Sequence, residues 1–110
     1  MSDQNFIEEI GGGVCAAWGV RASAATAGIK ESGRPDMTLI EFDPPAEAAG
    51  VYTRNLVCAA PVVLCRERVG KAPLRAFLVN SGVANACTGE AGLAAARRVC
   101  AALAERLGCG

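Results

Sequence analysis

Residues 74–107, LRAFLVNSGVANACTGEAGLAAARRVCAALAERL, decide the fold of this chain because they hold a strand, a loop and a helix in direct succession. Residues 74–80 are a near-continuous apolar run, which is typical of a strand covered on both faces. Beyond the loop, apolar side chains recur at spacings of three and four, so residues 88–107 form an amphipathic helix that we expect to pack on a sheet. The side chains that share its apolar face are Leu93, Ala96, Cys100, Leu103 and Leu107.

The two ends of this helix carry recognisable signals. Thr88 is placed to be the N-cap, which is typically worth about 1 kcal/mol. Glu90 suits the positive end of the helix macrodipole, and Gly108 is placed to end the helix. Arg97 and Arg98 fall outside the apolar face, and we interpret them as a solvated surface.

The rest of the sequence indicates further strands before the helix. We predict them at residues 14–20, 37–43, 50–53 and 61–67, with a bend over 24–35 and a strand end at Pro44-Pro45. Residues 1–13, which end in three glycines, are expected to be a flexible N-terminal arm. Strands followed by a terminal helix predict an α/β fold of sheet and helix layers, in which residues 14–110 are an incomplete domain whose other layers lie outside this chain.

Composition and charge exclude several classes of partner. Eleven basic and eleven acidic residues give a net charge of zero, so the chain lacks the basic surface that nucleic acids or membrane surfaces require. No apolar stretch approaches the roughly 18 residues of a membrane span, and the first residues lack the pattern of a signal peptide. We therefore expect a cytoplasmic location. Hydrophobic residues make up 52% of the chain, so we expect part of its surface to meet another polypeptide.

Cysteines and glycines give little support for a metal or a cofactor. The six cysteines contain no Cys-x-x-Cys pair, and the chain has no histidine, so a small metal or redox module is the weakest interpretation. We interpret most of the thiols as small buried hydrophobes. Gly11-Gly12-Gly13 lacks the residues that would continue a phosphate-binding or dinucleotide-binding loop. We expect neither a metal nor a cofactor.

The loop between the strand and the helix is the strongest candidate for chemistry. A helix N-terminus presents backbone N–H groups without helical partners, and the macrodipole adds to their attraction for negative charge. Gly89 allows close approach to the backbone, and Thr88 adds a hydroxyl donor, so the pair could stabilise the oxyanion of an acyl-transfer intermediate. From the spacing alone we favour the simpler interpretation, in which Thr88 is only a helix cap and Asn80, Ser81 and Asn85 are loop residues that bond their own backbone. Cys87 has no histidine to activate it and is interpreted as a packing residue.

Four motifs in this sequence resemble those of the bifunctional glutamate N-acetyltransferase, or ornithine acetyltransferase, family of arginine biosynthesis. Residues 80–90, NSGVANACTGE, are similar to the family signature NSGNANACTG. Residues 28–40, GIKESGRPDMTLI, are similar to GIKxSGRxDLALI. The segments AGVYTRN at 49–55 and AAPV at 59–62 follow the same order. The resemblance extends from about residue 14 to residue 108, within the amino-terminal part of the family's alpha chain.

The resemblance implies a layered α/β fold and an acetyl transfer from N-acetylornithine to glutamate; some members also use acetyl-CoA. In this family the polypeptide cuts itself before a downstream threonine, which becomes the nucleophile of a beta chain. The family's oxyanion hole is a Thr-Gly pair that maps onto Thr88 and Gly89. The implied partners are therefore the remainder of the alpha chain and the beta chain, in a hetero-oligomer.

Two departures from the family pattern support a competing interpretation. Val83 stands where the family has Asn, and none of the four threonines lies in the family's cleavage motif. We therefore expect this chain alone to lack the nucleophile and to be inactive. The alternative is a non-catalytic fragment or paralogue that serves as an interaction module.

Overall fold

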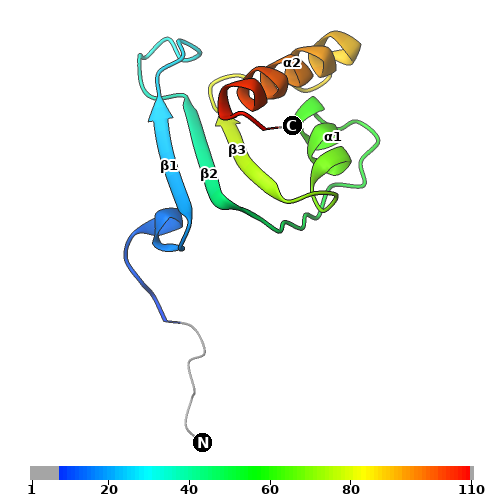
Figure 1. The fold of residues 1–110 in the computed structure, drawn as a ribbon. Coiled ribbons are helices and arrows are strands. Elements are labelled where there is room, and N and C mark those ends of the chain that lie inside the picture. Colours follow the sequence, from blue (N-terminus) through cyan, green and yellow to red (C-terminus); the bar gives the residue numbers. More distant parts are fainter. Residues whose placement is uncertain (1–7, 110) are drawn as a thin grey trace, which may run out of the picture.

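The computed structural model describes residues 8–109 and shows a three-stranded sheet beside two α-helices (Figure 1). The sheet has the order β1-β2-β3, with both neighbouring pairs antiparallel. A short 3₁₀ helix precedes it. The elements in chain order are η1 (Gly13–Ala16), β1 (Val20–Ala25), β2 (Met37–Ala46), α1 (Ala60–Arg68), β3 (Leu74–Asn80) and α2 (Gly89–Leu107). The α/β combination of sheet and helices agrees with the predicted fold class.

The register of the sheet places the last residues of β1 and β3 and the first residue of β2 at the same end of the sheet. Met37, the first residue of β2, pairs with Ala25 at the end of β1 and with Asn80 at the end of β3. The β1–β2 loop and the loop that leads into α2 therefore leave the sheet on the same side (Figure 1). On β2 and β3, Phe42 and Phe77 pack edge to face with ring centroids 5.8 Å apart, an arrangement that stabilises neighbouring strands.

Strand β2 continues past Pro44-Pro45, where the sequence predicts its end. Its pairing with β3 is irregular between Glu41 and Ala46, because proline has no N–H to donate to the ladder. Arg75 compensates in part: its Nη1 donates to the Phe42 carbonyl at 3.2 Å and lies 3.5 Å from the Asp43 carboxylate. The prolines interrupt the hydrogen bonding without ending the strand.

Residues 61–67, predicted as a strand, form most of helix α1. Short apolar runs fit a strand or a buried helix equally well, and Pro61 suits the first turn of a helix, where its missing N–H has no intrahelical acceptor. Ala60 and Leu64 lie four residues apart on the buried side of α1, which is helical spacing.

Two other predicted strands are also wrong. Residues 14–16 belong to η1, and β1 begins only at Val20, after Gly19 adopts a φ of 77°. A side chain at Gly19 would meet the Asp43 carbonyl oxygen at 2.6 Å, so the close approach of Gly19 to β2 needs a glycine. Residues 50–53 have no strand partner in the described chain.

Helix α2 matches the predicted element in length and face. All five predicted apolar-face residues are half-buried, whereas Arg97 and Arg98 are exposed. Gly108 ends the helix in a left-handed conformation: its N–H donates to the Glu105 carbonyl at 3.2 Å, and the Cys109 N–H to the Ala104 carbonyl at 2.9 Å.

Helix α2 contacts α1, and neither α-helix of residues 8–109 contacts a strand to the same extent. Arg97 bridges the helices, with its Nη2 at 3.1 and 3.3 Å from the two carboxylate oxygens of Glu67. The packing of the apolar face of α2 on a sheet stays a prediction.

The described chain has very little interior. Only Asp36, Ala60, Leu64 and Gly92 are buried. A compact protein of 11.2 kDa exposes about 5,700 Å², whereas this chain exposes 8522 Å². The cysteines are exposed or half-buried, so the prediction that most are buried is wrong, and those of residues 8–109 are free thiols.

Two further observations concern the predicted arm and membrane spans. Part of the arm predicted at residues 1–13 lies outside the described residues; residues 8–12 precede η1 and are exposed. Within residues 8–109, no helix has the length and apolar character needed to cross a membrane.

Candidate active site

The motifs at residues 28–40 and 80–90 meet at the end of the sheet from which the β1–β2 loop and the loop before α2 emerge. The Ser81 N–H donates to the Asp36 carbonyl at 2.8 Å, which joins the loop before α2 to the β1–β2 loop. Gly82 has a φ of 102°, and a side chain there would meet Cγ of Lys30 at 2.7 Å. Only glycine suits this crossing, because it tolerates both the conformation and the contact. Residues more than 40 positions apart in the sequence thus form one surface.

Asp36 organises the β1–β2 loop from its centre. Its side chain is only 2% exposed, and one carboxylate oxygen accepts the Ala27 N–H at 2.7 Å. The other oxygen accepts the N–H groups of Ile29 and Lys30 at 2.7 and 2.9 Å. The Ala27 N–H, with those of Lys30 and Ile29, holds the pKa of this carboxyl below its ordinary value of 3.8, against the opposing effect of burial. A charged carboxylate therefore replaces the regular hydrogen bonds that this loop lacks.

Asn85 organises the second loop. Its Oδ1 accepts the hydroxyl proton of Thr88, and its Nδ2 donates to the Gly92 carbonyl at 2.9 Å. The Asn85 carbonyl in turn accepts the N–H of Ala60 at 3.0 Å, which ties the loop to the start of α1. One residue thus connects the loop, the first turn of α2 and the N-terminus of α1.

The predicted site residues Thr88 and Gly89 lie together, exposed, at the N-terminus of α2. Thr88 is the N-cap residue, but its side chain makes no capping hydrogen bond to the backbone, so the cap energy expected from the sequence is absent. Gly89 has a φ of 61°, and a side chain there would meet nothing within 4 Å, so open space lies beside its backbone. Such a helix terminus can bind negative charge through N–H groups and a hydroxyl.

Two neighbours of the pair differ from expectation. Cys87, interpreted as a packing residue, is exposed and has a φ of 56°, so it does not fill a core. Val83, which replaces the family's Asn, is 63% exposed, and its carbonyl accepts a hydrogen bond of 3.4 Å from Asn80 Nδ2. The loop closes on itself at this point through a backbone atom and not through a second amide.

Asp36 and Gly92 also shape the candidate site, although neither was predicted from the sequence. A side chain at Gly92 would lie 1.7 Å from Thr88 Oγ1 and 2.5 Å from Asn85 Oδ1. A signal existed, because a glycine inside a helix costs about 1 kcal/mol relative to alanine and marks a close contact. Asp36 matches the Asp of the pattern GIKxSGRxDLALI, but apart from that resemblance an aspartate after a proline is an ordinary turn residue.

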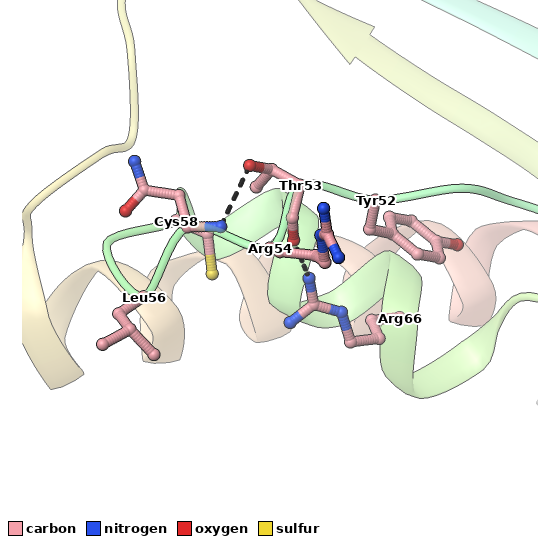
Figure 2. A pocket seen from close by; sticks show the side chains of 7 residues that line it. Tyr52, Thr53, Arg54, Leu56, Cys58 and Arg66 are labelled. Carbon is pink, nitrogen blue, oxygen red and sulfur yellow. Dashed lines mark hydrogen bonds between the residues drawn. The ribbon is translucent and has the colours of Figure 1, made fainter.

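An open groove lies between the 52–58 segment and α1 (Figure 2). Its volume is about 650 Å³, and Figure 2 shows Arg66 beneath the segment with Tyr52 beside it. The Arg66 guanidinium carbon lies 5.6 Å from the Tyr52 ring centroid, and Nη2 donates to the Thr53 carbonyl at 2.7 Å. Leu56, which lines the groove, is 99% exposed. The described residues include no cluster of His, Cys, Asp or Glu that could hold a metal ion.

Comparison with known proteins shows which family has sequences similar to this chain. A model of the ArgJ family matches residues 21–110. The arginine biosynthesis bifunctional protein ArgJ of Thermosynechococcus vestitus is 57% identical over 86 residues, which cover 77% of this chain and 20% of that protein. The protein of the same name from Geobacter sulfurreducens is 52% identical over 90 residues, which cover 82% of this chain and 23% of that protein. The chain spans about a fifth of the length of these relatives.

Two crystal structures share the fold. The arginine biosynthesis bifunctional protein ArgJ of Bacillus halodurans matches 86% of this chain and 50% of its own chain, with a TM-score of 0.80 and 40% identity. The ornithine acetyltransferase of Mycobacterium tuberculosis, solved in complex with ornithine, matches 72% of this chain and 42% of its own, with a TM-score of 0.68 and 50% identity. The similarity therefore extends to both sequence and three-dimensional arrangement.

Proposed function

The chain belongs to the ArgJ family, and from that premise we propose that it supplies the oxyanion-stabilising part of an acetyltransferase of arginine biosynthesis. The reaction moves an acetyl group from N-acetylornithine to glutamate. Thr88 and Gly89 stabilise the negative oxygen of the tetrahedral intermediate, the step at which fixed donors contribute most. No metal or cofactor takes part in this scheme.

The observation that supports this role is the position of the pair. Thr88 and Gly89 are exposed at the N-terminus of the longest helix of the described chain, in a loop that α1 and α2 hold from both sides. Backbone N–H groups there carry the positive end of the macrodipole. Donors held in place before the reaction need no reorganisation when charge develops, which is the condition for efficient stabilisation.

The proposed enzyme is larger than this chain. The threonine nucleophile, freed by self-cleavage, belongs to a beta chain, and the remainder of the alpha chain completes the fold in a cytoplasmic hetero-oligomer. The small interior of the described residues supports this arrangement, because half-buried faces such as that of α2 need further polypeptide to cover them.

The test is acetyl exchange with the chain completed by the remaining segments of a relative, such as the Thermosynechococcus vestitus protein. The completed protein should transfer acetyl from N-acetylornithine to glutamate. Thr88→Ala should lower kcat roughly a hundredfold to a thousandfold with little change in KM, because the donor acts mainly in the transition state. Acetyl-CoA, offered in place of N-acetylornithine, tests the second donor.

The matched control is Thr88→Ser, which keeps the hydroxyl and should retain most of the activity. Self-cleavage, followed by gel electrophoresis, shows separately whether each variant folds. A completed protein that cleaves itself and shows no acetyl exchange would favour the non-catalytic interaction module. Full activity in Thr88→Ala would remove this residue from the proposed site.

A further inference from the structure

We propose that Asn85 is a positioning residue: it accepts the hydrogen bond of the Thr88 hydroxyl in the resting enzyme. The hydroxyl turns to the substrate oxygen only when negative charge develops there. This inference rests on the proposed function of Thr88. It adds a residue for which the sequence offered only a local loop role.

The first step concerns the hydrogen bonds that the Thr88 hydroxyl can donate and accept. A hydroxyl has one proton to donate and two lone pairs that accept. In the structure the proton points to Oδ1 of Asn85, so the side chain presents lone pairs to its other neighbours. To donate to a substrate oxygen, the O–H must rotate about the Cβ–Oγ bond and leave Asn85, while the oxygen itself stays in place.

The second step is the competition between two acceptors. The amide oxygen of Asn85 and the acetyl carbonyl oxygen of a substrate are both neutral, so the substrate gains little by taking the proton in the ground state. Hydrogen bonds to an ionised acceptor are roughly twice as strong as neutral ones. The oxyanion therefore accepts a hydrogen bond from Thr88, whereas the neutral carbonyl does not displace Asn85. An interaction formed mainly in the transition state raises kcat without tightening substrate binding.

The third step is the support of Asn85 itself. Its amide cannot turn over freely, because Nδ2 donates to the Gly92 carbonyl at 2.9 Å. Its backbone is fixed by the 3.0 Å hydrogen bond from the Ala60 N–H. The Gly92 N–H also donates to the Thr88 carbonyl at 3.2 Å, so Thr88 and Gly92 are joined both through the helix backbone and through the Asn85 side chain. Thr88 Oγ1 is thus held in one place from two sides.

The experiment is a double-mutant cycle in the completed protein. Asn85→Ala should lower kcat about fivefold, the value of one ordinary hydrogen bond, and KM should stay level or fall because the freed hydroxyl can bind the neutral carbonyl. In a Thr88→Ala background, Asn85→Ala should cause no further loss of kcat. Asn85→Asp, which is nearly the same shape, offers Thr88 a charged acceptor but loses the hydrogen bond from Nδ2 to the Gly92 carbonyl. It should lower kcat more than Asn85→Ala does, and the part of the loss that comes from the stronger acceptor should disappear in the Thr88→Ala background.

Asn80→Ala is the matched control, since this amide of the same loop bonds the Val83 carbonyl and not Thr88. Its effect should be equal in both backgrounds. Equal effects of the Asn85 variants in both backgrounds, or a rise of KM with unchanged kcat, would overturn the positioning role. If Thr88→Ala itself retains full activity, the proposed function of Thr88 fails, and the two failures are thereby distinguished.

Discussion

At the scale of the residue, Asp36 accepts more backbone hydrogen bonds through its side chain than any other described residue. Three backbone N–H groups converge on its carboxylate, and its own carbonyl accepts the Ser81 N–H, so it joins both loops of the candidate site. Asp36→Asn should destabilise the loop, because an amide has one acceptor oxygen and turns an NH₂ group toward buried donors. We expect the amides of residues 27–30 to exchange with deuterium roughly tenfold faster in the completed protein.

The sign of the pH dependence follows from the lowered pKa of Asp36. Since the folded carboxyl titrates below its ordinary value of 3.8, its stabilising effect is complete above 3.8 and is lost as pH falls through the folded pKa. The stability difference between the wild type and Asp36→Asn, measured by denaturant unfolding, should be constant near neutral pH and shrink below 3.8. Asp43→Asn, at an exposed carboxylate, is the control and should change stability little. A difference that shrinks already near pH 6 would contradict the lowered pKa.

At the scale of the element, the first turn of α2 depends on the absence of a side chain at Gly92. Alanine normally strengthens a helix, but here its methyl group would overlap Thr88 Oγ1. Gly92→Ala should therefore cost about 1–3 kcal/mol through overpacking and should lower acetyl exchange by displacing Thr88. Denaturant unfolding and kcat of the completed protein measure the two effects.

The control for this element is Ala94→Gly, at an exposed position of the same helix. It should cost about 1 kcal/mol of helix propensity and leave kcat unchanged. If Gly92→Ala proves neutral or stabilising, the close contact between this turn and Thr88 is wrong.

At the scale of the whole molecule, the exposure of Leu56 tests whether more polypeptide covers this chain. A residue that is 99% exposed in the finished protein should tolerate substitution within about 0.5 kcal/mol. If another segment covers the groove beside α1, Leu56→Lys buries a charge and should lower the stability of the completed protein by several kcal/mol or block its self-cleavage. Ala101→Lys, on the exposed side of α2, is the control. Equal tolerance of both substitutions would show that Leu56 remains at the surface.

Prediction from sequence succeeded where one pattern was long and local. The helix over 88–107, its apolar face and its end at Gly108 all follow from side-chain spacing and one glycine, which are properties of the segment alone. Residues 61–67 lacked that information, because seven apolar-rich residues suit a strand as well as a helix. Pro61 suits a helix start, and the burial of Ala60 and Leu64 with the contact between α1 and α2 indicates that packing favours the helix.

The sequence by itself determined the family, the strand–loop–helix unit and the placement of Thr88 and Gly89 at a helix N-terminus. The tertiary structure decided what holds the loop around that pair. Asn85 and Gly92 lie only three and four residues from Thr88 in the sequence, and their contacts with it are local. The Asn85 carbonyl, however, accepts the N–H of Ala60, and the Asp36 carbonyl accepts the N–H of Ser81, between segments that only the fold brings together. No local pattern encodes a contact between residues that are distant in the chain, because such contacts depend on the folded path of the backbone.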